Sequence, residues 1–371
     1  MDIGVPRECK TQEYRVGLIP AVVNELVAAG HGVVVEQGCG LGAGFGDDDY
    51  RTVGARVVGS AAEVWDSAGL IVKVKEPQRH ECALLRPGQV IFTYLHLAAD
   101  PELADLLLAS DCIGIAYETV TNDAGRLPLL TPMSQIAGRI AVQAGAHYLE
   151  KSAGGRGVLL SGLDGAPPGK VVILGGGNVG GNAARIALGM GAEVTVFDAA
   201  ASRLDQLARQ FGSALSCLPA EPARVEEAVL GADLVIGSVL IPGAAAPKVV
   251  SAEVVEAMAA GTVLVDVAID QGGCFATSRP TSLDAPVYLE HGVIHYCVTN
   301  MPSTVARTAT LALNHITGPA VLAMANQGID AALRGNAHLR NGVNLYRGTL
   351  THRAVAESLG KPWRRVDALL D

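Results

Sequence analysis

The chain has 371 residues, of which 49% are hydrophobic and 18% charged, with 28 Lys and Arg against 37 Asp and Glu. At roughly 150 residues per domain this length predicts two domains, and a core large enough to need neither disulfides nor a structural metal. The net charge of −9 and the sequence pI of about 5.5 exclude a basic nucleic-acid-binding surface, and the apolar content excludes a disordered chain.

The cysteines and the apolar segments bear on the compartment. The seven cysteines are widely spaced, form no C-x-x-C pair and are odd in number, as expected of reduced thiols in a cytoplasmic protein. The first residues begin a strand-like run and show no signal peptide. The apolar segment 234–246 is interrupted by Pro242 and Gly243 and falls short of the roughly 18 residues that span a bilayer. We therefore expect a cytoplasmic protein with no membrane segment.

Short apolar runs alternate with amphipathic segments along the whole chain. Continuous apolar strands of this kind predict parallel sheets covered by helices on both faces. Ten strands are more than one twisted open sheet usually holds, so the pattern predicts two doubly wound, Rossmann-like α/β domains. The runs lie at 2–5, 32–36, 69–74, 90–95, 112–116, 170–174, 193–197, 233–239, 262–269 and 293–298.

Two long helical patterns divide the chain, one at 133–151 after Pro132 and one at about 303–334. Because they flank the central segment, they predict that one domain is inserted into the other. The expected outer, substrate-binding domain combines residues 1–130 and 305–371, and the inserted domain, 131–304, binds a dinucleotide.

A glycine-rich turn marks the expected dinucleotide site. The strand 170–174 is followed by Gly175, Gly177 and Gly180 in a G-x-G-x-x-G pattern, and then by a helical segment. A second strand ends at Asp198, 18 residues after Gly180. A carboxylate there would bind the ribose hydroxyls and repel a 2′-phosphate, which favours NAD over NADP, although the nearby Arg203 could receive a phosphate. The alternative is a flexible loop beside a solvated Asp.

Polar residues follow four of the predicted strands: Lys75, His96, Asp270 and Asn300. Ligands of open α/β sheets bind beyond the carboxyl ends of the strands, so domain closure would bring these four groups to one cleft. Purely structural roles are possible for several polar residues. Lys75 could be a solvated loop residue and Asp270 a turn former. Arg15 could be a surface charge and Ser134 a helix N-cap.

Several stretches of the sequence match one known family from end to end. They include Lys73-Val-Lys-Glu-Pro77, the segment around His96, the glycine-rich turn, Asp266-Val-Ala-Ile-Asp270 and Asn300-Met-Pro-Ser303. On these motifs the chain resembles the alanine dehydrogenase/pyridine nucleotide transhydrogenase family. The resemblance implies reversible, NAD-dependent oxidative deamination of L-alanine to pyruvate and ammonium by a homohexamer.

The resemblance also implies roles for individual residues. Arg15 and Lys75 hold the carboxylate and carbonyl of the substrate, while the His96 imidazole is the general acid/base. Asp270 is its catalytic partner, and Met133 and Asn300 line the substrate pocket. The implied cofactor contacts are Ser134, Gly175, Gly177, Asn178, Val179, Gly180, Asp198, Arg203, Val239, Leu240, Val267, Ala268, Ile269, Asp270, Arg279, Val298, Asn300 and Met301.

Two departures from the family pattern and two other functions have to be considered. Ala220 replaces a Ser near the adenosine of some relatives, and Ala323 and Gln327 replace the Glu and His of a reported metal site, so we expect no metal. The first alternative function is a dehydrogenase for another small 2-oxo acid, such as glyoxylate, or for a hydroxy acid. The second is a non-catalytic NAD(H)-binding subunit that resembles the soluble domain of transhydrogenase.

Overall fold

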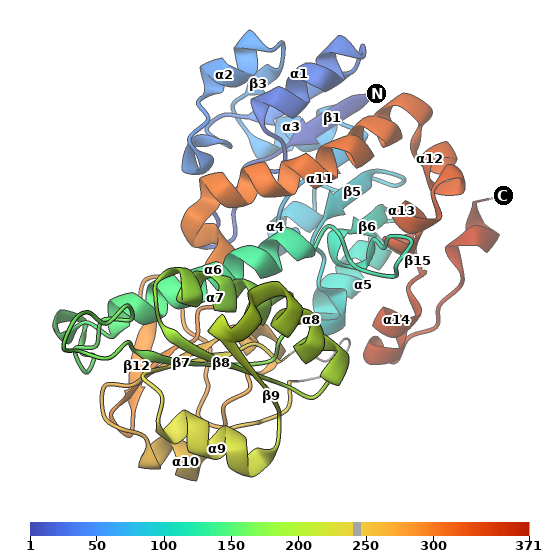
Figure 1. Cartoon of the computed structure of the whole chain (residues 1–371). Helices are drawn as coiled ribbons and strands as arrows, with labels where there is room; N and C mark the ends of the chain where they lie inside the picture. Colours follow the sequence, from blue (N-terminus) through green and yellow to red (C-terminus); the bar gives the residue numbers. More distant parts are fainter. Residues whose placement is uncertain (240–245, 371) are drawn as a thin grey trace. The chain divides into compact units, whose positions relative to one another are not determined.

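The computed structural model describes residues 1–239 and 246–370. The chain divides into two compact units, one made of Met1–Pro132 with Val305–Asp371 and the other of Met133–Thr304 (Figure 1). Helix α6, Thr131–Tyr148, begins at the end of the first unit and belongs mainly to the second. Each unit is built around its own sheet.

The first unit contains an eight-stranded sheet in the order β15-β14-β6-β5-β4-β1-β2-β3. Strands β1 to β6 run parallel, whereas β14 pairs antiparallel with β6 and β15 antiparallel with β14. The strands are β1 Asp2–Val5, β2 Gly32–Glu36, β3 Arg56–Val58, β4 Leu70–Val72, β5 Val90–Thr93, β6 Ile113–Ala116, β14 Val343–Tyr346 and β15 Thr349–Leu350.

Buried β-branched and aliphatic residues explain the central strands, because both faces of β4, β5 and β6 are covered. On one face Trp65 and Leu107 pack with residues of β4, β5 and β14 in a continuous core. The helices of the unit are α1 Pro20–Ala28, α2 Asp47–Thr52, α3 Ala61–Ser67, α4 Arg79–Cys82, α5 Pro101–Ala109, α11 Ala306–Gln327, α12 Ile329–Gly335, α13 Ala337–Asn341 and α14 Arg353–Leu359.

The second unit contains a seven-stranded sheet in the order β12-β13-β11-β10-β7-β8-β9, parallel except for the edge strand β12. Helices α7 and α8 lie on one side of this sheet and α9 and α10 on the other (Figure 1). The strands are β7 Lys170–Leu174, β8 Glu193–Asp198, β9 Leu215–Pro219, β10 Leu234–Gly237, β11 Val263–Asp266, β12 Val287–Glu290 and β13 Val293–Tyr296. The helices are α7 Asn178–Gly189, α8 Ala201–Phe211, α9 Pro222–Leu230 and α10 Ala252–Ala257.

The two faces of this second sheet are packed differently. On the side of α9 and α10, large residues such as Phe197 and Phe275 fill the core. On the side of α7, the buried helix residues are Gly180, Ala183, Ala184 and Ala187. These small residues let the first turns of α7 approach the sheet closely, which places the start of α7 at the carboxyl end of β7.

Two mostly parallel sheets with flanking helices confirm the predicted α/β class, and every predicted apolar run contains a strand. The predicted single helix at 303–334 is wrong. Helix α11 ends at Gln327 because Gly328 adopts a positive φ of 80°, and α12 then begins at Ile329. Among the described helices, none combines the length and the hydropathy needed to cross a membrane.

Candidate functional site

Arg15 lies in the long loop between β1 and α1, and its side chain is buried. The Glu13 carboxylate accepts bonds from Arg15 Nε and Nη2, both at 2.6 Å, and from the Arg15 backbone N–H at 3.0 Å. Burial alone would lower the pKa of Arg15, but Glu13 raises it, so the guanidinium stays charged. A fixed, buried guanidinium of this kind suits a carboxylate ligand, and the interpretation of Arg15 as a surface charge is wrong.

The loop that carries Arg15 is held against helix α11 and strand β4. The Val16 N–H donates to Thr310 Oγ1 at 3.3 Å, and the Ile19 N–H donates to Asn314 Oδ1 at 2.9 Å. A Cβ atom at Gly17 would overlap the carbonyl oxygen of Val72. These contacts place Arg15 at the end of β4, on the same edge of the sheet as Lys75.

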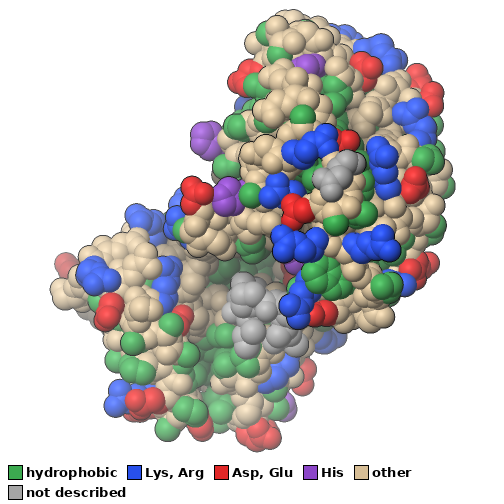
Figure 2. All heavy atoms as spheres, turned by 90° about the vertical axis from the view of Figure 1, so that its right-hand side faces the viewer, with side chains coloured by type: hydrophobic (Ala, Val, Ile, Leu, Met, Phe, Trp, Pro, Cys, Tyr) green, Lys and Arg blue, Asp and Glu red, His purple; other side chains and the backbone are tan. Residues whose placement is uncertain are grey.

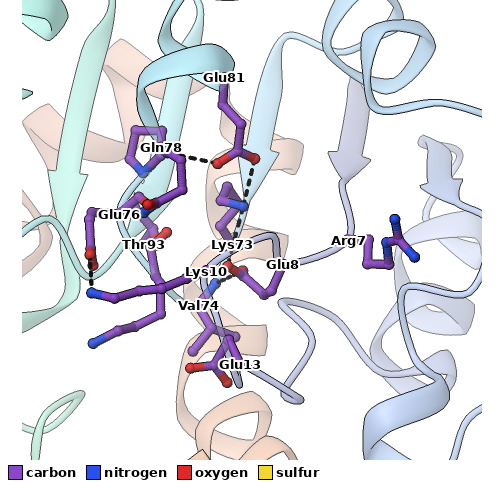
Figure 3. Close-up of polar contacts among 12 residues, drawn as sticks. Arg7, Glu8, Lys10, Glu13, Lys73, Val74, Glu76, Gln78, Glu81 and Thr93 are labelled. Carbon is purple, nitrogen blue, oxygen red and sulfur yellow. Dashed lines mark hydrogen bonds and ion pairs between the residues drawn. The ribbon is translucent and has the colours of Figure 1, made fainter. Parts of the chain in front are cut away.

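Lys75 follows β4, and its side chain is partly buried. Thr93 Oγ1 donates to the carbonyl oxygen of Lys75 at 2.9 Å. Although burial would raise the pKa of the neighbouring Glu76, Lys75 and Lys10 lower it, which keeps that carboxylate charged. Figure 3 shows Lys10, Glu76 and Thr93 together with a cluster formed by Glu8, Lys73 and Glu81.

His96 follows β5 in an unusual backbone conformation, with φ of 49° and ψ of 33°. The Glu118 carboxylate accepts the His96 N–H at 2.7 Å and the Leu95 N–H at 3.2 Å, which stabilises this left-handed turn. The exposed imidazole stacks on the buried ring of Tyr94, with centroids 5.8 Å apart and an interplanar angle of 15°. The imidazole is therefore oriented while it stays open to solvent.

The first unit thus brings three predicted residues to one edge of its sheet. Lys75 and His96 follow the adjacent strands β4 and β5. Tyr94, which stacks on His96, also lies close enough to Arg15 for the guanidinium to oppose the rise that burial causes in the pKa of the Tyr94 phenol. A guanidinium, an ammonium and an imidazole grouped in this way can bind a carboxylate, polarise a carbonyl oxygen and transfer protons.

In the second unit the glycine-rich turn has the geometry that a dinucleotide requires. Gly175 has a φ of 97°, and a Cβ atom at Gly180 would overlap the carbonyl oxygen of Gly175. Gly177 is the N-cap of α7, no side chain caps the helix, and the space around its Cβ position is open. The first N–H groups of α7 can therefore bind a pyrophosphate, flanked by Asn178 and Val179.

Asp198, the last residue of β8, supports this turn directly. Its carboxylate accepts the Gly176 N–H at 2.6 Å and the Ala200 N–H at 2.8 Å. Arg203, in the first turn of α8, donates to the carbonyl oxygens of Gly176 and Gly177. One side of the turn thus carries both a carboxylate and a guanidinium.

Asp270 lies on the short 3₁₀ turn Ile269–Gln271 that follows β11, and it is exposed. The loop around it is organised by Asp266, whose fully buried carboxylate accepts the N–H groups of Ala268 at 3.1 Å and Cys274 at 2.9 Å. The Ser278 hydroxyl also donates to Asp266, at 2.5 Å. Asp270 is therefore held at the tip of a loop wrapped around a second carboxylate.

The other predicted contacts of the second unit are distributed over three places. Around the β10 and β11 ends lie Val239, Val267, Ala268 and Ile269. A second group, Val298, Asn300 and Met301, follows β13. In the third place, the Arg279 guanidinium stacks on Tyr288, 4.1 Å from the ring centroid. Met133 and Ser134 lie in the first turn of α6, so the interpretation of Ser134 as an N-cap is wrong. Leu240 lies outside the described residues.

Four acidic residues with structural roles at these loops were not predicted: Glu8, Glu13, Glu118 and Asp266. Each accepts backbone N–H groups near a predicted residue. The sequence signal was their presence within or beside stretches that match the family: Gly4-Val-Pro-Arg-Glu8, Tyr14-Arg-Val16, Ala116-Tyr-Glu-Thr-Val120 and Asp266-Val-Ala-Ile-Asp270. Nothing in the spacing reveals a bond to a distant peptide. Within the described residues, no three His, Cys, Asp or Glu side chains are grouped to hold a metal.

On the face drawn in Figure 2, Lys and Arg side chains are interspersed with Asp and Glu side chains, so this face is neither uniformly basic nor uniformly acidic. A polar hollow of about 350 Å³ lies over α7, between α6 and α8. It is lined by Gln135, Arg139, Asn178, Gly181, Asn182, Arg185, Arg203, Gln206 and Gln210. Two of these residues, Asn178 and Arg203, belong to the predicted cofactor contacts.

Comparison with known proteins identifies the family. The profile "Alanine dehydrogenase/PNT, N-terminal domain" matches residues 4–137, and "Alanine dehydrogenase/PNT, C-terminal domain" matches residues 141–353. The chain belongs to this family. It is 52% identical to an alanine dehydrogenase of Halomonas elongata over 100% of both chains. It is 48% identical to the Mycolicibacterium smegmatis alanine dehydrogenase over 98% of both chains.

Solved structures of the family agree with this assignment. An L-alanine dehydrogenase structure superimposes with a TM-score of 0.94 at 52% identity, covering 97% of this chain and 99% of that one. A transhydrogenase from Sinorhizobium meliloti has a TM-score of 0.82 at 24% identity, covering 95% and 100%, and shares the fold. The predicted family resemblance is thereby confirmed.

Proposed function

We propose that the chain is an L-alanine dehydrogenase that uses NAD in the reversible oxidative deamination of L-alanine to pyruvate and ammonium. The observation that carries the proposal is the grouping of Arg15, Lys75 and His96 at one sheet edge of the first unit, in a chain related over its full length to alanine dehydrogenases. A binding subunit without catalysis would not need an imidazole that stacks on Tyr94, on a strained backbone turn that Glu118 stabilises.

The residues of the first unit would bind and activate the 2-oxo acid. The buried Arg15 guanidinium pairs with the pyruvate carboxylate, and the Lys75 ammonium polarises the carbonyl oxygen. When ammonia adds to the carbonyl carbon, His96 transfers the protons that allow water to leave, and the resulting imine is reduced to alanine. Asp270 stabilises the cationic imine or orders water. Met133 and Asn300 line the pocket.

The second unit would hold the cofactor, which accepts or donates the hydride when bound. Gly175, Gly177 and Gly180 shape the turn, and Asn178 and Val179 present helix N–H groups to the pyrophosphate. Asp198 binds the adenosine ribose and Arg203 flanks it. The further contacts are Ser134, Val239, Leu240, Val267, Ala268, Ile269, Asp270, Arg279, Val298, Asn300 and Met301.

Some finer assignments rest on the family alone. We propose a homohexamer in the cytoplasm, with the first unit as the substrate domain and the second as the cofactor domain. Its partners are the small molecules L-alanine, pyruvate and ammonium, and no metal is required. Sedimentation of the purified chain with and without a chelator tests the oligomeric state and the metal together.

The test of the activity is oxidation of NADH by pyruvate with and without ammonium, in wild type and His96→Asn. Asn tolerates a positive φ, so this change removes the imidazole and keeps the turn. His291→Asn is a matched control, because His291 is also exposed and has a φ of 51°. We expect ammonium-dependent oxidation that His96→Asn abolishes and His291→Asn leaves intact. Oxidation without ammonium would indicate a hydroxy-acid dehydrogenase, and NADH binding without oxidation a non-catalytic subunit.

A further inference from the structure

The backbone that leads into Lys75 is paired on one side by strand β5. Beyond the end of β4, the Lys73 N–H donates to the Phe92 carbonyl at 3.1 Å, and the Tyr94 N–H donates to the Val74 carbonyl at 3.2 Å. Together with the Thr93 bond to the Lys75 carbonyl, these contacts continue the β4–β5 ladder past the last strand residue. Motion toward or away from β5 is therefore restricted.

The opposite side of this segment has lost its strand neighbour. Strand β1 pairs with β4 at Ile3 and Gly4 and ends at Val5, after which the chain leaves the sheet. The Val74 N–H points to that side, and Glu8 Oε1 accepts it at 2.6 Å (Figure 3). The Glu8 carboxylate thus occupies the place of the absent β1 carbonyl group.

The Glu8 carboxylate is itself fixed. Lys73 Nζ lies 3.2 Å from Glu8 Oε2 and 2.8 Å from Glu81 Oε1, and the side chains of all three residues are at most 2% exposed. Glu81 Oε2 in turn accepts the Gln78 N–H at 2.8 Å, at the start of α4. An acceptor held by a buried ammonium cannot turn into solvent, so it keeps a constant position for the amide it binds.

We infer that Glu8 is a positioning residue for Lys75: its carboxylate completes the hydrogen bonding of the β4 extension and thereby fixes the ammonium that faces the substrate carbonyl. The inference rests on the proposed role of Lys75. Only one peptide separates the clamped Val74 N–H from Lys75. Misplacement of a catalytic group by about 1 Å can cost on the order of 100-fold in rate, so loosening this peptide should reduce turnover.

Three variants separate the acceptor from the charge. Glu8→Gln keeps an acceptor oxygen at the same reach, Glu8→Asp keeps the charge but is one methylene too short for Val74, and Glu8→Leu removes both. We expect kcat/KM for pyruvate to fall roughly 10- to 100-fold in the Asp and Leu variants through kcat, and to stay within about threefold of wild type in the Gln variant. NADH affinity should not change in any of them.

Asp233→Leu is the matched control. Asp233 also accepts a backbone N–H, that of Lys170 at 2.8 Å, and pairs with Arg156 at 3.2 Å, but it lies in the second unit, directly before β10. This variant should lose stability without a change in kcat. If the role of Glu8 is purely structural, its variants should also lose stability without a change in kcat, and that result would overturn the inference.

The second measurement does not depend on activity. Amide hydrogen exchange of the 73–76 peptide should accelerate in Glu8→Asp and Glu8→Leu, and remain slow in Glu8→Gln. If Glu8→Leu does not fold, the Asp and Gln variants decide: equal kcat/KM in both, or a larger loss in Gln, refutes the clamp. A wild type that lacks ammonium-dependent turnover would refute the proposed function, whereas the exchange result would still test the clamp.

Discussion

Glu8 should make the stability of the first unit depend on pH near neutrality. The pKa of Glu8 is raised from 4.5 to about 7, mainly by burial and also by the neighbouring Glu13 and Glu81 carboxylates, against the opposing effects of Lys73 and of the Val74 N–H bond. The folded chain therefore keeps a proton that the unfolded chain releases. The stabilisation that this proton gives the folded state is complete below about pH 4.5 and is lost as the pH rises through about 7.

The size of the effect follows from the two pKa values. The difference between the two pKa values corresponds to about 3 kcal/mol at roughly 1.4 kcal/mol for each unit. By the linkage relation, most of this amount, about 2–3 kcal/mol, is lost between pH 5 and pH 8. Glu8→Gln does not titrate, so the difference in unfolding free energy between wild type and this variant should change by that amount over the interval.

Tryptophan fluorescence during urea unfolding is the appropriate assay. Both tryptophans, Trp65 and Trp363, belong to the first unit, and Trp65 is fully buried, so the signal reports the unit that contains Glu8. Comparison with the variant at each pH cancels the titration of all other groups. Glu25→Gln, at an exposed position of α1, controls for the loss of one carboxyl group. Parallel pH profiles for wild type and Glu8→Gln would refute the reasoning.

Other positions give equally direct expectations. Gly180→Ala should weaken NADH binding, measured by calorimetric titration, at least about tenfold and lower the free energy of unfolding by about 1–3 kcal/mol, because the new methyl group would overlap the Gly175 carbonyl. Gly189→Ala, at an open position of the same helix, should leave NADH binding unchanged and be neutral or stabilising in urea unfolding. Asp198→Asn should reduce the ratio of kcat/KM for NADH over NADPH, since it removes the charge that repels a 2′-phosphate; an unchanged ratio would contradict that role. Asn314→Ala leaves a buried N–H of the loop after β1 unpaired, so urea unfolding should show a loss of about 1–3 kcal/mol and the KM for pyruvate should rise. A stability loss without the KM change would separate this contact from substrate binding.

The buried central strands could be predicted from the sequence because a short, continuous apolar run between turn residues is typical of a strand covered on both faces. The strands that escaped prediction are mostly at sheet edges. Strand β3 is short and half exposed, β9 has a single buried residue, Leu215, and β12 has no fully buried residue. Strand β14 is fully buried but contains Asn344, whose polar side chain bonds to Thr119 and so interrupts an otherwise apolar pattern.

The candidate site could be predicted where a polar side chain lies shortly after a buried strand, as for Lys75, His96 and Asp270. The supporting residues were not predictable in this way. Glu118 lies 22 residues after His96 and Glu8 lies 66 residues before Val74, and in each case the partner is a peptide N–H that any residue would supply. A sequence pattern cannot identify a partner that has no side-chain identity.

The backbone-binding carboxylates also limit how this sequence can evolve. Glu8, Glu118 and Asp266 each reach a particular N–H group across a gap set by the sheet, so side-chain length is under selection as much as charge. An Asp–Glu exchange, which substitution scores treat as mild, should be excluded at these positions in related enzymes. Invariance of these three carboxylates among related enzymes would reflect the spacing of the backbone. In an alignment it could not be distinguished from the invariance of a group that takes part in the reaction.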